Sequence, residues 1–265
     1  MEGVRAVSTL APARSFLSLV KIEHSVFALP FAYLSALTAM ARGPHRVTWG
    51  DLLLITVAMV GARTFAMAAN RIIDRHIDAR TALLNPLCLA LSPLAVLPLI
   101  VYPYAKRFTN WPHGILALAQ MVGPVGAWLA VTGTVRGSFP AWVLGAAVGL
   151  WIGGFDLIYA TQDVEVDREI GVHSVPARYG VRFALVASAV AHVVTFGLFV
   201  WYGVLVGLGA WWWAGLLVTA VAFGYEHAIV RPGDLSRVNR AFFTANGFVG
   251  IALFAFALAD LIGRL

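Results

Sequence analysis

Apolar runs of about twenty residues follow one another along almost the whole chain, separated by short polar turns. A helix that crosses a bilayer needs ~20 mostly apolar residues. Only 12% of the 265 residues are charged, whereas about a quarter is usual in soluble domains, so these runs are not the core of a soluble protein. We therefore expect an all-α, polytopic transmembrane helix bundle that forms a single domain over residues 1–265.

About eight runs are long enough to cross the membrane. The expected spans are, approximately, Phe16–Met40, Leu52–Ile73, Ala82–Tyr104, Ile115–Thr134, Trp142–Thr161, Phe183–Val206, Trp211–Val230 and Phe242–Leu261. The net charge of +6 could suggest a nucleic-acid partner. In a chain this apolar, basic loops retained on the cytoplasmic side explain it better, so we expect a lipid bilayer and no nucleic acid.

Two acidic windows stand at the ends of apolar spans. In the first, Asn70, Asp74 and Asp78 are four residues apart and so share one face of a helix. In the second, Asp163 and Asp167 repeat this spacing. Either window alone is equally compatible with solvated acids at a helix end. Together, facing each other, they would supply the hard oxygen ligands that Mg²⁺ shares with substrate phosphates.

Several other polar side chains are candidates for substrate contacts. Lys106 and Arg178 are close in sequence to spans that lead into the proposed site, and either could bind a diphosphate. Arg63 is inside a span, where a charge is expensive, so we expect it to face a polar interior. His24, His192 and His227 have no ligand spacing between them and are interpreted as packed or capping residues.

The order of the basic loops is inconsistent with a simple up-and-down bundle. The basic loops around Arg75 and Lys106 should lie on the same side of the membrane, yet only one apolar run separates them. Either that run, which contains four prolines, is a re-entrant hairpin, or a loop and one span are missing between about Arg80 and Leu83. The length of the run, ~23 residues, slightly favours the second alternative.

The two motifs, Asn70-x-x-x-Asp74-x-x-x-Asp78 and Tyr159-Ala160-Thr161-Gln162-Asp163-x-x-x-Asp167, resemble the aspartate-rich motifs of the UbiA superfamily of intramembrane prenyltransferases. The segments Tyr102–Thr109 and Gly171–Gly180 match as well, and the stretch Lys21–Phe31 is most similar to the 4-hydroxybenzoate polyprenyltransferase branch, which includes members of menaquinone synthesis. The chain departs from the family pattern at Arg71, where a second acid is common. It also lacks the family's third helix, because Arg80 runs almost directly into the counterpart of the fourth.

The resemblance implies nine helices around a cavity whose cytoplasmic mouth carries the motifs, in a bacterial inner membrane protein. It implies Mg²⁺-dependent transfer of a prenyl group from a polyprenyl diphosphate to an aromatic acid, for quinone synthesis. In this chain Asn70, Asp74, Asp78, Asp163 and Asp167 would hold the metal, with Asp74 and Asp163 essential for catalysis. The remaining expected site residues are Lys106 and Arg178 for the diphosphate, Tyr159 for substrate, Arg63 for the acceptor carboxylate and Asp156 for its hydroxyl.

A membrane transporter that uses intramembrane acids for cation or proton coupling is the alternative. Such a protein would place its acids near the middle of the membrane. The paired acids stand at span ends, which favours the enzyme, whereas Asp156 and Glu226 keep the transporter open.

Overall fold

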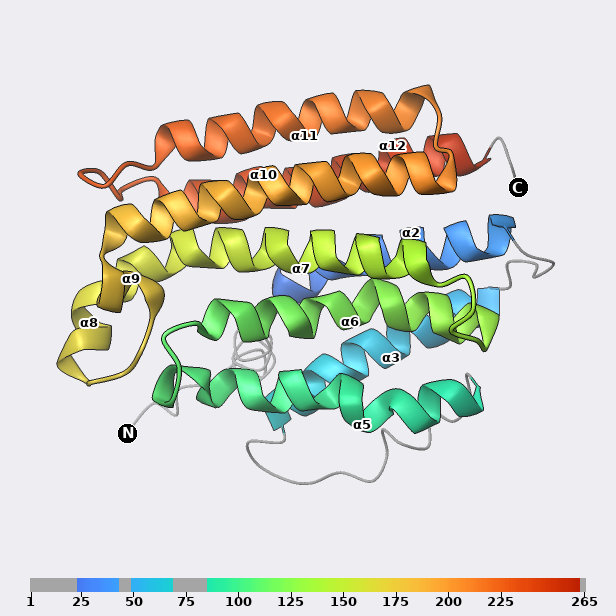
Figure 1. The fold of residues 1–265 in the computed structure, drawn as a ribbon, viewed down its shortest axis with the longest axis horizontal. Coiled ribbons are helices and arrows are strands. Elements are labelled where there is room, and N and C mark those ends of the chain that lie inside the picture. Colours follow the sequence, from blue (N-terminus) through green and yellow to red (C-terminus); the bar gives the residue numbers. More distant parts are fainter. Residues whose placement is uncertain (1–22, 43–48, 69–84, 263–265) are drawn as a thin grey trace, which may run out of the picture.

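The computed structural model describes residues 23–42, 49–68 and 85–262, and it gives the backbone alone for residues 23–28 and 60–68. Eight long helices lie side by side along one common direction (Figure 1). They are α2 (Glu23–Arg42), α3 (Trp49–Ala68), α5 (Pro86–Val101), α6 (Pro112–Thr132), α7 (Phe139–Tyr159), α10 (Val181–Val206), α11 (Ala210–Ile229) and α12 (Asn246–Ile262). The expected all-α bundle is therefore confirmed.

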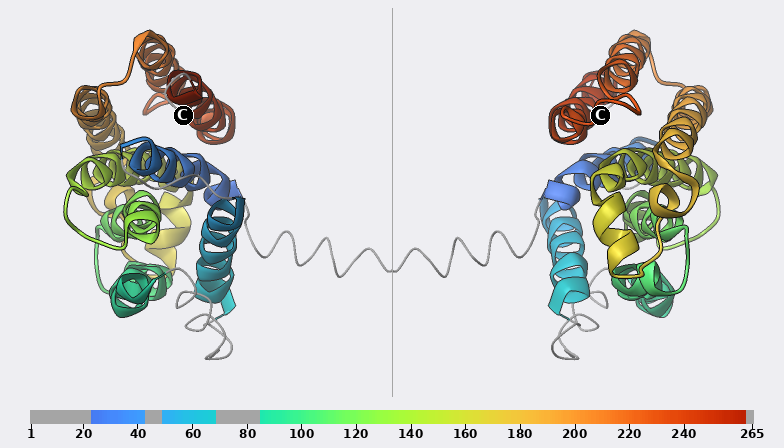
Figure 2. Two further views of the ribbon diagram at one scale, coloured as in Figure 1. Left: turned by 90° about the vertical axis from the view of Figure 1, so that its right-hand side faces the viewer. Right: turned by 90° about the vertical axis from the view of Figure 1, so that its left-hand side faces the viewer.

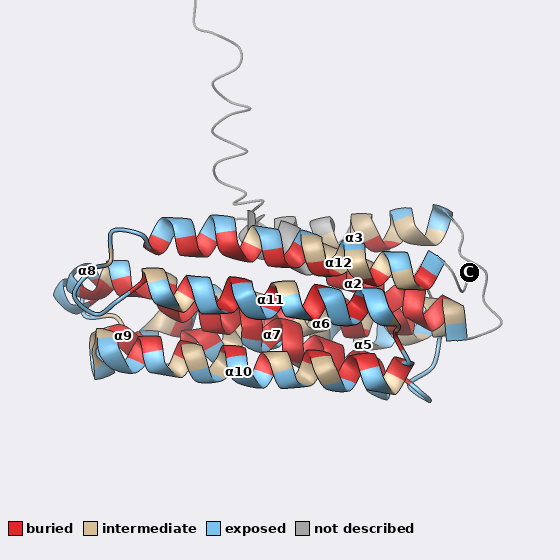
Figure 3. Ribbon diagram, turned by 90° about the horizontal axis from the view of Figure 1, so that it is seen from above, coloured by how far each residue is buried: buried red, intermediate tan, exposed pale blue. Residues whose placement is uncertain are grey.

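Five helical segments of the described chain are long and apolar enough to cross a membrane. They cover Pro86–Arg107, Pro112–Thr132, Phe139–Glu169, Val181–Val206 and Arg240–Ile262. Their outward surfaces carry large apolar side chains such as Val193 and Leu94, which are 73% and 67% exposed. Figure 3 shows these exposed strips on the outside of the bundle and the buried strips facing its interior. A surface of this kind is suited to contact with lipid rather than water.

The helix α5 crosses the bundle once. It is continuous from Pro86 to Val101, in spite of Pro93 and Pro98, and a 3₁₀ helix, η1 (Tyr102–Arg107), extends it. The re-entrant hairpin considered for this segment is therefore wrong. At the start of α5, Asn85 donates hydrogen bonds from Nδ2 to the carbonyl oxygens of Leu129 and Ala130, so α5 runs opposite to α6.

The helix α3 also runs opposite to α6. Ile55 shares an apolar cluster with Ala127, and Met59, one turn later in α3, lies against Gly123, one turn earlier in α6. Consequently α3 and α5, consecutive long helices among the described residues, point in the same direction (Figure 1). This parallel pair is the arrangement that the distribution of basic loops indicated. Residues 69–84, which join the two helices, lie outside the described part of the chain.

The closest approach between helices is that of α6 and α7. Gly145, Gly149 and Gly153, four residues apart on α7, face the backbone carbonyl oxygens of Met121, Ala117 and His113 on α6. A Cβ atom built on Gly149 would be 2.4 Å from the oxygen of Ala117. Small residues at this spacing let membrane helices approach backbone to backbone. As a result, α7 lies at the centre of the bundle, with Trp151, Ile152 and Phe155 fully buried.

Short elements collect at one end of the bundle, on the left in Figure 1. Besides η1 they are η2 (Ala160–Asp163), α8 (Val164–Glu169), α9 (Val175–Tyr179) and the π-helical turn η3 (Arg240–Ala245). Viewed along the helices, α7 lies between α6 and α10, and α2 lies beside α6 and α12 (Figure 2). The candidate site is at the end that carries the short elements.

Candidate active site

An ammonium group and two carboxylates form the polar centre of this end. Lys106 donates from Nζ to both carboxylate oxygens of Asp167, at 2.9 and 3.0 Å, and the same Nζ is 3.8 Å from Oδ2 of Asp163. The Asp167 side chain is nearly buried, whereas those of Lys106 and Asp163 are 37% and 50% exposed. The cluster is therefore reached from the end of the bundle, and it joins three of the residues expected in the site.

Local backbone structure holds this cluster in place. The 3₁₀ turn η1, which has Pro103 as its second residue, carries Lys106 at the end of the bundle. The carbonyl oxygen of Lys106 accepts a 2.6 Å hydrogen bond from the backbone N–H of His173, which lies in the loop after α8. In the same loop Ser174 caps α9 through its Oγ, which accepts from the N–H of Ala177. These bonds fix the two chain segments that carry Lys106 and Asp167 against each other.

The three side chains also form a plausible position for a divalent cation. Asp163 and Asp167 present oxygen ligands, and Mg²⁺ prefers one or two carboxylates together with waters and phosphate oxygens. The carboxylates of Asp163 and Asp167 therefore fit a Mg²⁺ ion. The Lys106 ammonium now holds both oxygens of Asp167 and would have to move for this carboxylate to bind a metal. The other half of the expected ligand set, Asn70, Asp74 and Asp78, lies outside the described residues.

Aromatic rings form a wall behind the cluster. Tyr159, one turn before Asp163, stacks at a tilt against Phe242 of η3 with ring centroids 4.4 Å apart. Phe155 meets Phe242 edge-on at 5.0 Å, and Phe243 adds an edge contact to Tyr159 at 6.5 Å. Aromatic faces stabilise a nearby positive charge. Tyr159, which was expected to contact substrate, is thus accompanied by three phenylalanines that the sequence did not reveal.

A buried histidine–aspartate pair lies one turn further into the bundle. His113 of α6 and Asp156 of α7 are joined by a 2.6 Å hydrogen bond between Nδ1 and Oδ2. Both residues are buried, and Nε2 of His113 has no hydrogen-bond partner in the part of the chain that the structure describes. The close approach of Gly153 to the backbone of His113 brings the two side chains together. Asp156 was expected in the site, whereas His113 was missed because the pair spans two helices and leaves no local spacing.

The described contacts do not connect Arg178 and Arg63, the two arginines expected to bind substrate, to this site. Arg178 is exposed at the end of α9, near the cluster in the chain but without a contact to it that identifies a role. Arg63 falls within α3, and its side chain lies outside the described residues. The predictions for both arginines remain predictions.

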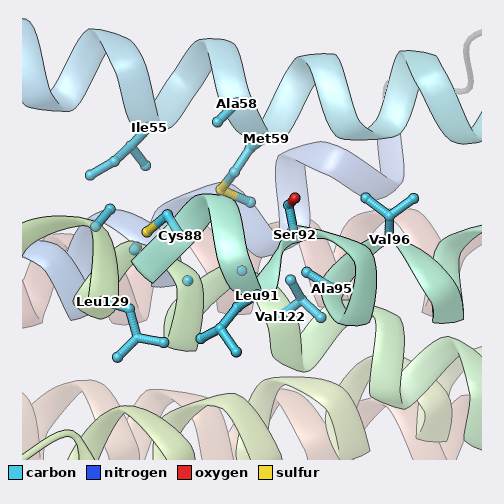
Figure 4. Close-up of a pocket in the computed structure, with 14 residues that line it drawn as sticks. Ile55, Ala58, Met59, Cys88, Leu91, Ser92, Ala95, Val96, Val122 and Leu129 are labelled. Atoms are coloured by element: carbon cyan, nitrogen blue, oxygen red, sulfur yellow. The ribbon is translucent and has the colours of Figure 1, made fainter. Parts of the chain in front are cut away.

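A cavity of about 160 Å³ lies away from this polar end, between α3, α5 and α6. Its lining includes Ile55, Met59, Leu91 and Val122, and Ser92 is the one lining side chain with an oxygen atom. Figure 4 shows these apolar side chains around the space, with Ser92 at its edge. The cavity begins at the end of α5 that is remote from Lys106. Because its lining is apolar, it is suited to hydrocarbon and not to a phosphate group.

The histidines of α10 and α11 were interpreted too simply. His192 is buried, as expected of a packed residue, but its Nδ1 lies 2.9 Å from Nε2 of His227 and 3.5 Å from Oε2 of Glu226. These three side chains form a cluster of their own. Sequence spacing did not indicate it, because His192 is on another helix.

The bundle of long apolar helices defines an integral membrane protein. Residues 81–248 match the UbiA prenyltransferase family, so the chain belongs to this family. The 4-hydroxybenzoate octaprenyltransferase of Nitrosococcus oceani is 35% identical over 176 residues, which are 66% of this chain and 61% of the relative. That of Xanthomonas campestris pv. campestris is 36% identical over 181 residues, 68% of this chain and 59% of the relative. The chain thus spans about three fifths of the length of these curated relatives.

Solved structures share the whole architecture. The apo structure of a UbiA homolog from Aeropyrum pernix K1 superimposes with a TM-score of 0.77 and 30% identity, covering 91% of this chain and 98% of that one. A UbiA homolog from Archaeoglobus fulgidus, solved with GPP and Mg²⁺, gives a TM-score of 0.64 at 15% identity, covering 94% and 99%. The second similarity shows a common fold.

Proposed function

We propose that this protein transfers a polyprenyl group from a polyprenyl diphosphate to an aromatic acid, such as 4-hydroxybenzoate or a dihydroxynaphthoate, in quinone biosynthesis. The observation that carries the proposal is the cluster of Lys106, Asp163 and Asp167 at the mouth of an apolar bundle. A charged diphosphate with an apolar tail needs this combination of a polar, cation-binding end and a lipid-facing body. The names of the curated relatives support the acceptor class.

Mg²⁺ is the proposed cofactor, held by Asp163 and Asp167 together with Asn70, Asp74 and Asp78. When bound, the metal neutralises charge on the leaving diphosphate. Lys106 adds a positive charge. Because its side chain is partly exposed, its ammonium group can move from Asp167 to a phosphate oxygen. Arg178 is proposed to bind the same diphosphate. Positive groups placed where negative charge develops lower the barrier to breaking the carbon–oxygen bond.

Tyr159, the half-buried ring of the aromatic wall, is proposed to stabilise the allylic cation, with the fully buried Phe155 and Phe242 packed behind it. Asp156 accepts or shares the Nδ1 proton of His113, which leaves Nε2 of His113 to receive a proton from the acceptor. Asp156 would therefore act on the acceptor hydroxyl through His113, and Arg63 would bind the acceptor carboxylate. A proton acceptor is required, because substitution on an aromatic ring releases one proton.

The polar end is proposed to face the cytoplasm of a bacterial inner membrane. Basic residues of the described chain concentrate there: Lys106, Arg107, Arg168, Arg178, Arg182, Arg231, Arg237 and Arg240. Arg42 and Arg136 stand at the other end. Loops rich in lysine and arginine tend to remain in the cytoplasm.

The test is a prenyl-transfer assay in membranes with Mg²⁺ and a panel of aromatic acids. Asp163→Asn and Asp167→Asn should each reduce turnover by about a hundredfold or more, because each removes a charge that holds the cation. Glu165→Gln is the matched control, since this exposed acid lies between them on the same turn. Normal turnover in both aspartate variants would sink the proposal. Solute uptake into vesicles without any prenyl diphosphate would favour the transporter instead.

A further inference from the structure

Three ligand-type side chains converge inside the bundle, apart from the Lys106 cluster. Their donor atoms, a nitrogen of His192, an oxygen of Glu226 and a nitrogen of His227, all lie within 4.8 Å of one another. His192 belongs to α10, whereas the other two are neighbours on α11. His192 and Glu226 are buried and His227 is half-buried, so water does not surround the point where they meet.

Hydrogen bonds to neighbouring residues orient His192 and Glu226 toward each other. Nε2 of His192 lies 3.3 Å from the carbonyl oxygen of Trp151, to which it can donate, and this leaves the Nδ1 lone pair directed at Glu226 and His227. Oε1 of Glu226 accepts a 2.8 Å hydrogen bond from Nδ2 of Asn246. Asn246 in turn accepts from Nε1 of Trp151 at 2.7 Å. Metal-binding histidines and carboxylates in proteins are held by outer hydrogen bonds of this type.

Hydrogen bonding alone does not satisfy the cluster. If Nε2 of His227 donates to Nδ1 of His192, at 2.9 Å, both of these nitrogen atoms take part in a hydrogen bond. Oε2 of Glu226 is then left buried, 3.5 Å from His192 and with no hydrogen-bond partner among the described residues. A buried polar oxygen without a partner is unfavourable in an apolar interior. A cation at the point of convergence would contact all three donors at once.

We propose that His192, Glu226 and His227 bind a divalent transition metal of the zinc class. Two imidazole nitrogens and one carboxylate oxygen are a donor set that Zn²⁺ accepts, with the fourth position left for water. Ligands about 2.0–2.2 Å from a tetrahedral zinc are roughly 3.3–3.5 Å from each other. The separations of 2.9 and 3.5 Å from Nδ1 of His192 are close to this range, and the donor atoms of Glu226 and His227 lie within 4.8 Å of each other.

The metal would fasten four helices together. It joins α10 to α11 directly, and the outer bonds of Trp151 and Asn246 extend the connection to α7 and α12. Trp151 contacts Phe155 edge-on at 5.5 Å, and Phe155 contacts Phe242. A metal here therefore supports the aromatic wall from behind. The site shares no residue with the Lys106 cluster, and the proposal does not depend on prenyl transfer.

The experiment is metal analysis of the purified, tag-free full chain in detergent. The protein is stripped with a chelator and then dialysed against low micromolar Zn²⁺ or Co²⁺. We expect about one Zn²⁺ per chain and, with Co²⁺, the visible absorption of a four-coordinate site. Glu226→Gln and His227→Ala should each lose most of the bound metal. Glu226→Gln keeps the oxygen that Asn246 bonds, so this variant should fold.

Two controls locate the metal. His173→Ala removes an exposed histidine outside the cluster, and the Asp163→Asn, Asp167→Asn double variant removes the acids of the other site; both should retain Zn²⁺. The chelator should lower the thermal unfolding midpoint of the wild type by several degrees and leave that of Glu226→Gln unchanged, because only a bound metal stabilises. Wild type that takes up no metal, or Glu226→Gln that still takes it up, would overturn the proposal.

Discussion

At the scale of single residues, the distinction between Lys106 and its neighbour is the most informative. Lys106 donates hydrogen bonds to both carboxylate oxygens of Asp167. Arg107 instead lies over the ring of Tyr104, with its guanidinium carbon 5.6 Å from the ring centroid. Two adjacent cations at the same bundle end therefore have different surroundings. A general electrostatic attraction for the diphosphate would involve both, but a positioned charge would involve Lys106 alone.

Lys106→Met is expected to reduce prenyl transfer by about a hundredfold, because it removes a charge placed at the leaving group. Arg107→Met, which removes the adjacent charge, should reduce the rate much less. The measurement is the initial rate of product formation in membranes at saturating Mg²⁺. Equal losses in the two variants would contradict a specific role for Lys106.

The sequence predicted those residues whose partners are near in the chain or share a family motif. Asp163 and Asp167 were recognised by their spacing, and Lys106 by its nearness in sequence to a span that leads into the proposed site. His113 and the cluster around Glu226 were not, because each joins two or more helices. Whether two side chains on different helices meet depends on the rotation and axial offset of the helices, and local spacing contains neither.

At the scale of elements, the close contact of α6 and α7 sets the geometry of the interior. Gly149→Ala would place a Cβ atom 2.4 Å from the carbonyl oxygen of Ala117, which is backbone and cannot move aside. We expect this change to destabilise the protein by about 1–3 kcal/mol, as overpacking does. Gly197→Ala in α10 has open space around it and should be neutral. Thermal unfolding midpoints in detergent compare them, and equal midpoints would contradict the close packing.

Helix positions followed closely from hydropathy, and helix ends did not. The expected span Phe183–Val206 is within two residues of α10, and Trp211–Val230 is within one residue of α11. The expected span Ile115–Thr134 begins three residues after the start of α6, and Phe242–Leu261 begins four residues before the start of α12. The expected end of the second span at Ile73 lies outside the described residues. Apolar length determines that a helix exists, whereas its ends depend on turns and caps such as Asn85 at α5, which are weaker local signals.

At the scale of the whole molecule, the parallel pair α3 and α5 determines which ends of the helices share a membrane side. The α6–α7 turn and the α8 segment should be on opposite sides, with α8 in the cytoplasm. In a Cys88→Ala background, Arg136→Cys should react with an impermeant thiol reagent added to intact cells. Glu169→Cys should react only after the cells are opened. The reverse pattern would contradict the proposed orientation.

The central claim is that the Asp163–Asp167 end of this chain holds a metal-bound prenyl diphosphate. Calorimetric titration of the purified protein with GPP, with and without Mg²⁺, tests it most directly. We expect GPP binding that requires Mg²⁺ in the wild type and in Glu165→Gln. We expect this binding to be lost in Asp167→Asn. Binding of equal strength in Asp167→Asn, or binding that does not depend on Mg²⁺, would contradict the claim.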